Sequence, residues 1–221
     1  MPLSIFSNKL RQLPKAELHC HLDGSMRPST LLELAREQRI KLPRETAEEL
    51  SDFMRVDDAQ SLEDYLRRFD VTISVLQNQE ALERAAYELA EDAAEDGVRY
   101  IEVRNAPILN VVRGLTLVEA VEAPLRGLRR AEKEFNITAR FIICGLRQNP
   151  PQSSLDLAKL AVEFKNEGVV AFDLAGGEKG NPASRHVEAF RYAREHDLAV
   201  TCHAGEGDGA HSIREAVHVL G

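Results

Sequence analysis

The chain has 221 residues, of which 43% are hydrophobic and 29% are charged, and its formal net charge is −8. This apolar content is enough for one sizeable core and excludes a disordered chain. No apolar stretch approaches the roughly 18 residues of a membrane span. An acidic chain without a Lys/Arg cluster is a poor partner for nucleic acid or an anionic membrane. Three cysteines are too few for a disulfide framework and suit a reducing compartment, so we expect a cytoplasmic protein.

Hydrophobic periodicity divides residues 1–221, which we expect to form a single domain, into helices and strands. We expect strands over five ranges: 16–22, 98–104, 139–146, 169–175 and 198–203. We expect helices over seven ranges: 30–39, 61–76, 79–96, 117–135, 154–167, 183–196 and 212–220. Pro124 predicts a break or a kink in the helix that contains it. Strands separated by helices indicate a parallel α/β fold.

Three of the predicted strands have one apolar face and one face that turns polar near the carboxyl end. Alternate side chains of a strand point to opposite sides, so the polar faces can be read directly from the sequence. These faces carry three residues each: Glu17, His19 and His21; Tyr100, Glu102 and Arg104; Ala199, Thr201 and His203. A sheet covered by helices on both sides favours apolar residues on both faces, whereas a barrel interior can end in a polar layer. The pattern therefore favours a (β/α)8 TIM-type barrel over a doubly wound sheet.

Three histidines form a candidate metal site. His19 and His21 lie two residues apart on one predicted strand, so their rings point the same way and can share an ion. The alternative is two unrelated histidines, one packed and one exposed. His203 ends another strand with matching orientation. Three neutral imidazoles that converge on one point, with a position left open for water, suit Zn²⁺.

Polar residues and glycines beyond the strand ends are further candidates. Gly205 permits a sharp turn, after which Glu206 can return toward the metal and move protons for metal-activated water. The alternative for Glu206 is a solvated loop carboxylate. Asp23 either caps a turn or accepts a hydrogen bond from a substrate hydroxyl. Gly176 either lets the backbone approach a ligand closely or only makes a turn.

Several segments of this chain resemble the adenosine deaminase family. They are Leu13–Ser25 (LPKAELHCHLDGS), Asp173–Gly176 (DLAG) and Thr201–Glu206 (TCHAGE), in the family's order and at plausible separations. The segment Ser61–Asp70 (SLEDYLRRFD) resembles the family's helical insertion after the first strand, which we place at about residues 27–77. The histidine pair alone is shared by many metal-dependent hydrolases, but the combination of these motifs is specific.

This resemblance implies a metal-dependent barrel enzyme of purine metabolism. It implies hydrolysis of the 6-amino group of adenosine, or of a close adenosine-like nucleoside, by zinc-activated water, with ammonia and an inosine-type nucleoside as products. Three residues carry over as ligands of one Zn²⁺: His19, His21 and His203. The resemblance also implies contacts with the purine ring: Glu206 protonates N1, and the Gly176 N–H reaches a ring nitrogen. It further implies that Asp23 bonds a ribose hydroxyl and that His21 lies close to the sugar.

The chain departs from the family pattern at its end. Family members supply a further histidine after the sixth strand and aspartates after the eighth, whereas this sequence ends at Gly221 after five strand–helix units. We therefore expect an N-terminal part of a longer deaminase, or a barrel that another chain completes. The expected partners are a small purine nucleoside and the C-terminal part of the same polypeptide.

Other functions remain open at this point. If the reaction is a hydrolytic deamination, the alternative substrates are adenine, an N6-substituted AMP or an aminofutalosine-type nucleoside. Asp23 favours a substrate with a free hydroxyl over one with a phosphate, because like charges repel. Outside it, the chain is a metal phosphoesterase with the same histidine pair, or an inactive fragment that binds zinc or a partner.

Overall fold

The computed structural model describes residues 10, 11 and 13–221, and its strands form one sheet. Positions 1–9 and 12 of the expected domain lie outside the described residues. The strands lie in chain order: β1 (Lys15–His21), β2 (Val98–Asn105), β3 (Thr138–Leu146), β4 (Val169–Ala175) and β5 (Ala199–Val200). All neighbouring pairs are parallel. A doubly wound sheet reverses its strand order, whereas a TIM-type barrel adds each strand beside the last. The prediction of a (β/α)8 barrel with five strand–helix units present is confirmed.

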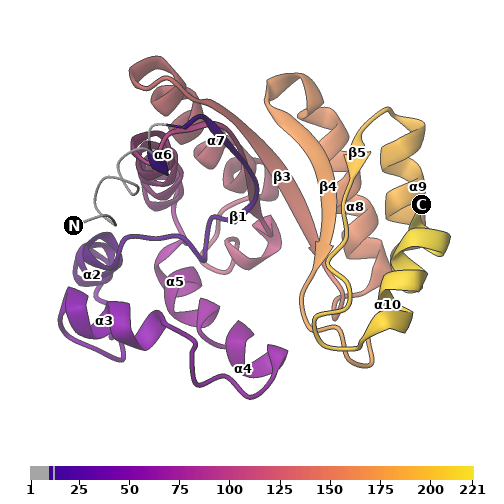
Figure 1. Ribbon diagram of the computed structural model, residues 1–221, viewed down its shortest axis with the longest axis horizontal. Helices are drawn as coiled ribbons and strands as arrows, with labels where there is room; N and C mark the ends of the chain where they lie inside the picture. Colours follow the sequence, from indigo (N-terminus) through magenta and orange to yellow (C-terminus); the bar gives the residue numbers. More distant parts are fainter. Residues whose placement is uncertain (1–9, 12) are drawn as a thin grey trace.

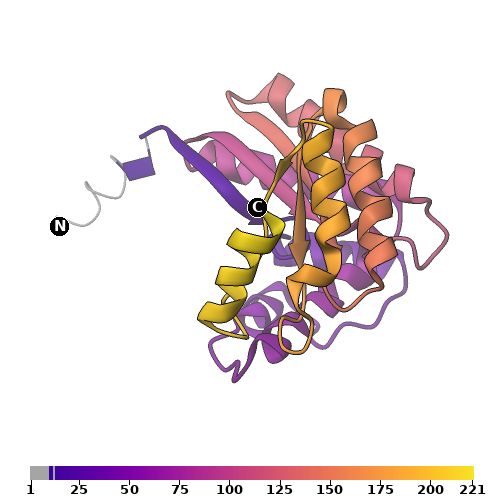
Figure 2. The same ribbon diagram turned by 90° about the vertical axis from the view of Figure 1, so that its right-hand side faces the viewer.

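Helices pack outside the curved sheet and also gather at one end of it (Figure 1). The α-helices are α2 (Pro28–Glu37), α3 (Ala47–Met54), α4 (Leu62–Leu66), α5 (Phe69–Val75), α6 (Gln79–Glu95), α7 (Leu117–Glu134), α8 (Pro151–Glu163), α9 (Val187–Glu195) and α10 (Ala210–Glu215). Short 3-10 turns cover Pro107–Leu109, Lys165–Glu167 and Ala183–His186, and a π turn covers Ala216–Leu220. Helices α6 to α9 contact the strands, and Figure 2 shows α8 and α9 side by side against them. Helices α2 to α5 lie toward the end to which the β4 arrow points in Figure 1.

The main core lies between the strands and the outer helices. Ile101 of β2 and Phe141 of β3 are fully buried, as is Leu128 of α7. Phe172 of β4 meets Phe190 of α9 edge to face, with ring centroids 5.4 Å apart. Burial of these large side chains holds each helix to its strand and so fixes where the strand ends lie.

The last strand is shorter than the expected range 198–203, because only Ala199 and Val200 have strand geometry. Its ladder nevertheless continues: the N–H of Thr201 donates to the carbonyl of Phe172, and the N–H of His203 donates to that of Leu174. His203 is thus held against the carboxyl end of β4, as the longer strand predicts.

Two expected helices differ in detail from the structure. The range 61–76 contains α4 and α5, which meet at a short turn through Arg67 and Arg68, although both of these residues keep helical angles. Of the break or kink predicted at Pro124, the break is wrong, because α7 runs through this residue without interruption. Packing of the buried residues on both sides of Pro124 outweighs the lost hydrogen bond at this position.

Helix α3 was not expected, although its sequence carries a start signal. The Thr46 hydroxyl accepts from the N–H of Glu49, whose carboxylate accepts from the N–H of Thr46. This reciprocal capping box is readable as Thr-x-x-Glu.

The sheet is open at both sides within the described residues, since β1 and β5 are its outer strands. The outer strand β1 leaves Leu18 55% exposed. Among the described helices, none combines the length and the apolar character needed to cross a membrane.

Candidate functional site

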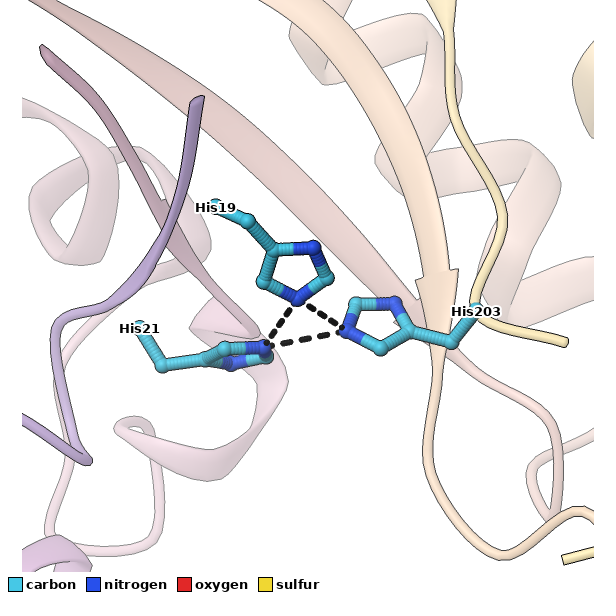
Figure 3. A group of neighbouring side chains, drawn as sticks. All are labelled: His19, His21 and His203. Carbon is cyan, nitrogen blue, oxygen red and sulfur yellow. Dashed lines mark hydrogen bonds between the residues drawn. The ribbon is translucent and has the colours of Figure 1, made fainter. Parts of the chain in front are cut away.

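Three imidazole rings converge where β1 ends and where the chain continues beyond β5 (Figure 3). The Nε2 atoms of His19 and His203 lie 2.9 Å apart, those of His21 and His203 3.0 Å, and those of His19 and His21 3.3 Å. Nitrogen ligands at 2.0–2.1 Å from a tetrahedral zinc ion are separated by about 3.3 Å. The observed separations are at or slightly below this value, so the cluster fits one Zn²⁺.

Two of the three histidines, His19 and His21, are in the neutral state that metal binding requires. Burial, followed by the neighbouring His203 and His19, lowers the pKa of His21 to about 3. Burial, Arg104 and His203 likewise lower the pKa of His19. Neutral imidazoles keep a lone pair on Nε2, so both residues can act as ligands near neutral pH.

Asp173 orients the ring of His203. This carboxylate lies two residues before the end of β4 and is completely buried, and its Oδ2 lies 2.9 Å from Nδ1 of His203. The contact occupies the far nitrogen of the ring and leaves Nε2 to face His19 and His21. Carboxylate partners of this kind set the orientation and basicity of metal-bound histidines. Although Asp173 belongs to a family motif, the sequence reading assigned it no role; its signal was a lone charge within the apolar strand Val169–Ala175.

Arg104 ties this carboxylate to the first strand. The side chain is 3% exposed, its Nη1 donates to Oδ2 of Asp173 at 3.1 Å, and its Nη2 donates to the carbonyl of Leu18 at 2.8 Å. Burial alone would raise the pKa of Asp173, but the bond to His203, the charges of His203 and Arg104, and the bond from Thr201 hold it below its usual value. The sequence places Arg104 only on the polar face of its strand. The structure instead places it between β1 and β4, directly behind the histidines.

A cavity of about 460 Å³ opens beside the histidines. It lies in the usual size range of small-molecule sites. All six sequence-predicted site residues line it: His19, His21, Asp23, Gly176, His203 and Glu206. Helices α4 and α5 supply an apolar wall from Leu62, Tyr65, Leu66, Phe69 and Ile73. The predicted strand ends and the predicted helical insertion therefore meet around one space.

Asp23 is a buried carboxylate with an unpaired oxygen, as expected of a residue that binds a ligand. It is 6% exposed, and its Oδ1 has no hydrogen-bond partner among the described residues. Burial raises the pKa of Asp23 to about 6 against the opposing effect of backbone N–H bonds. A buried polar atom without a partner costs free energy, and a hydroxyl donor within the cavity would remove this cost.

Two glycines shape the cavity rim. Gly205 has φ +88°, and a Cβ on it would approach Ile213 to 2.5 Å. The sharp turn predicted at Gly205 is therefore confirmed, and it brings exposed Glu206 to the cavity. Gly176 has φ +95°, and a Cβ there would meet the Gln148 amide at 2.3 Å. Gly176 lines the cavity, and the absence of a Cβ there permits the close approach of the Gln148 side chain.

Sequence comparison assigns the chain to a family. The profile of the family described as adenosine deaminase matches residues 14–221. The chain belongs to the adenosine deaminase family. The adenosine deaminase of Clostridium botulinum (strain 657 / Type Ba4) is 41% identical over 211 residues, which are 95% of this chain and 64% of that protein.

Structure comparison agrees with the family. An adenine deaminase from Arthrobacter aurescens matches with a TM-score of 0.83 and 29% identity, over 93% of this chain and 62% of that one. A Burkholderia ambifaria amidohydrolase with bound Zn matches with a TM-score of 0.83 and 28% identity, over 97% of this chain and 58% of that one. The chain thus spans less than two thirds of the length of each of these three proteins.

Proposed function

We propose that the protein is a zinc-dependent adenosine deaminase, which hydrolyses the 6-amino group of adenosine or a close adenosine-like nucleoside and releases ammonia. One observation carries this proposal: the three-imidazole cluster and the unpartnered carboxylate of Asp23 face the same 460 Å³ cavity. A metal site and a hydroxyl acceptor in one cavity suit a substrate that joins a reactive ring to a sugar.

The three histidines would hold a single Zn²⁺ at the cavity wall. When bound there, zinc supplies a nucleophile at neutral pH by lowering the pKa of a bound water to about 7. Asp173 and Arg104 keep His203 in the orientation that zinc binding requires.

The other cavity residues act on the purine nucleoside. Glu206 donates a proton to N1 of the ring, so that the ring accepts electrons at C6 without building a full negative charge. Asp23 accepts a hydrogen bond from a ribose hydroxyl, with His21 close to the sugar, and the N–H of Gly176 bonds a ring nitrogen. The apolar wall of α4 and α5 covers the base and excludes water.

Asp23 also bears on which purine is the substrate. A buried carboxylate attracts a free hydroxyl and repels a phosphate, which favours a nucleoside over an N6-substituted AMP. Adenine carries no hydroxyl to satisfy Asp23 and is the second candidate, because the adenine deaminase of Arthrobacter aurescens shares this fold. An aminofutalosine-type nucleoside keeps a ribose and would be accepted by the same contacts.

We further propose that barrel strands from the same polypeptide or from another chain cover β1 and β5. Support comes from the exposed Leu18 on the outer strand β1. A cytoplasmic location is proposed on the free thiols of Cys20, Cys144 and Cys202.

The test is an assay of the native protein with adenosine, adenine, N6-methyl-AMP and a phosphoester, with zinc content measured in parallel. We expect one zinc per chain and ammonia release that is fastest from adenosine. Faster release from adenine or N6-methyl-AMP would make that compound the substrate. Orthophosphate release without ammonia would replace the proposal by a phosphoesterase, and zinc binding without either product would leave a binding protein.

The Asp23→Asn variant tests the sugar contact. Loss of a hydrogen bond to a charged group costs about 1.5–3 kcal/mol, so kcat/KM for adenosine should fall roughly 10- to 150-fold while that for adenine changes little. Asp52→Asn on the exposed surface of α3 is the matched control and should leave both unchanged. An equal loss with adenosine and adenine would contradict the sugar contact.

A further inference from the structure

Glu178 gathers the hydrogen-bond donors of the loop that follows β5. It lies three residues beyond β4 and is 3% exposed. Its Oε1 accepts from the N–H of Gly205 at 2.6 Å and from the hydroxyl of Ser212. Its Oε2 accepts from the N–H groups of Gly207 at 2.5 Å and Asp208 at 3.0 Å. One buried carboxylate therefore fastens the loop at its start, in its middle and at the first turn of α10.

Glu206 lies between two of these fastened amides. Its own carboxylate is exposed and makes no hydrogen bond to any described residue. The backbone therefore sets the direction of the Cα–Cβ bond of Glu206, and the N–H groups on both sides of this residue, at Gly205 and Gly207, bind the same carboxylate. Glu178 thus holds the backbone that carries Glu206 without contacting the Glu206 side chain.

The charge of Glu178 suits this role. Burial raises its pKa, but the Ser212 hydroxyl and the loop N–H groups outweigh burial and lower the pKa to about 2. The Glu178 carboxylate is thus negatively charged, and each of its hydrogen-bond partners in the loop and in α10 is a donor. An uncharged amide of the same size would turn an NH₂ group toward backbone N–H donors and lose at least one of these contacts.

A buried arginine connects the same carboxylate to the histidine cluster. Arg147 is fully buried, with its Nη2 3.9 Å from Oε1 of Glu178. The same Nη2 donates to the backbone carbonyl of His203. The position of His203 and that of the loop behind it are therefore set by adjacent buried charges of opposite sign.

We infer that Glu178 is a positioning residue: its carboxylate holds the loop 204–209 so that Glu206 faces the cavity in the reaction proposed above. The inference rests on that proposed function, in which Glu206 acts on the purine ring. Glu178 lies outside the cavity lining and is not expected to contact the substrate or the metal.

The first test is Glu178→Gln in the native protein, with adenosine as substrate. A displaced catalytic group can cost about a hundredfold in rate, so we expect kcat to fall roughly 10- to 100-fold with KM changed by less than about threefold. Zinc content should stay unchanged, because no metal ligand is altered. Glu188→Gln, on the exposed surface of α9, is the matched control and should leave kcat unchanged. An unchanged kcat in Glu178→Gln would overturn the inference.

A double-mutant cycle separates positioning from a general structural effect. If Glu178 acts through Glu206, then Glu178→Gln should lower kcat by less than about twofold once Glu206→Gln is present. Losses that multiply in the double variant would show that Glu178 acts elsewhere and would overturn the inference.

Amide hydrogen exchange of residues 205–208 gives a readout that does not depend on activity. We expect exchange to be about tenfold faster or more in Glu178→Gln and to rise by a smaller factor in Ser212→Ala, which removes one donor and serves if the first variant does not fold. Unchanged exchange would overturn the inference. If the native protein released no ammonia, the proposed deaminase activity would fail, whereas exchange would still decide whether Glu178 holds the loop.

Discussion

Asp173 joins the buried groups behind His203, so Asp173→Asn is the most direct perturbation of the site. The carboxylate accepts from Nη1 of Arg104 at 3.1 Å, from the hydroxyl of Thr201 at 2.8 Å and from the thiol of Cys144 at 3.3 Å. His203 contributes the fourth contact, at 2.9 Å. An asparagine has one acceptor oxygen, and its NH₂ group would face donors, so the substitution leaves several of these groups without partners.

The largest cost arises at Arg104. The Nη2 of its buried guanidinium bonds the carbonyl of Leu18, and its Nε has no partner among the described residues. Removing the charge of Asp173 weakens one of the two hydrogen-bonded contacts of the Arg104 guanidinium. The carbonyl of Leu18 is the acceptor that remains unchanged. Breaking a buried ion pair by removing one partner costs about 3–5 kcal/mol, and we expect the unfolding free energy of the metal-free protein to fall by this amount. Zinc affinity should fall about 10- to 100-fold, because His203 loses its orienting partner.

The assay is urea unfolding of the metal-free protein followed by a zinc competition titration. Asp92→Asn is the matched control, because this carboxylate is 47% exposed and pairs with Arg27 at the surface; a change below about 1 kcal/mol is expected there. Removing both buried charges, in Arg104→Met/Asp173→Asn, should recover part of the lost stability. The reasoning would be refuted if Asp173→Asn unfolded within about 1 kcal/mol of the unaltered protein and bound zinc equally well.

Three further predictions concern the metal, the turn and the pH dependence. Zinc at a hundred times its Kd should stabilise the protein by about 2.7 kcal/mol in thermal or urea unfolding, and His19→Ala should abolish most of this gain. Gly205→Ala should lower the unfolding free energy by about 1–3 kcal/mol, and by more than Gly180→Ala. Both glycines have positive φ, but only at Gly205 would a Cβ also clash with Ile213. Equal losses in the two variants would contradict the contribution of this clash. The lowered pKa of Glu178 means that its contribution to stability is complete above the ordinary carboxyl pKa and is lost as the pH falls through about 2. The stability difference between the unaltered protein and Glu178→Gln should therefore shrink on acidification from about pH 5, and a constant difference in urea unfolding would refute this.

Local sequence patterns were sufficient for most of the architecture. The alternation along Val98–Arg104 and the apolar run Val169–Ala175 predict strands that the structure contains. Parity along β1 predicts that His19 and His21 point the same way, as observed. These features depend on the two-residue period of a strand, which the sequence carries directly.

The errors arose where packing outweighs local preference. Pro124 is a helix breaker by its own chemistry, yet α7 continues through it because its buried face is packed along its length. Only Ala199 and Val200 of the expected strand 198–203 have strand geometry, and Thr201 and His203 keep their places through hydrogen bonds to β4. Neither outcome depends on residues adjacent in sequence, so neither was readable from a window of the chain.

The sequence by itself determined the residue types and their spacing: two histidines on one strand, a third on another, and the turn at Gly205 that leads to Glu206. Only the tertiary structure decided which groups stand behind them. Asp173 contacts His203 across 30 residues, and Glu178 binds the loop that contains Glu206 across 27 to 30 residues. Such contacts exist because parallel strands bring their carboxyl ends to one edge of the sheet, where burial forces each charge to find a partner. The spacing of histidines therefore indicates the chemistry, whereas the folded sheet determines the orientation of the groups that would perform it.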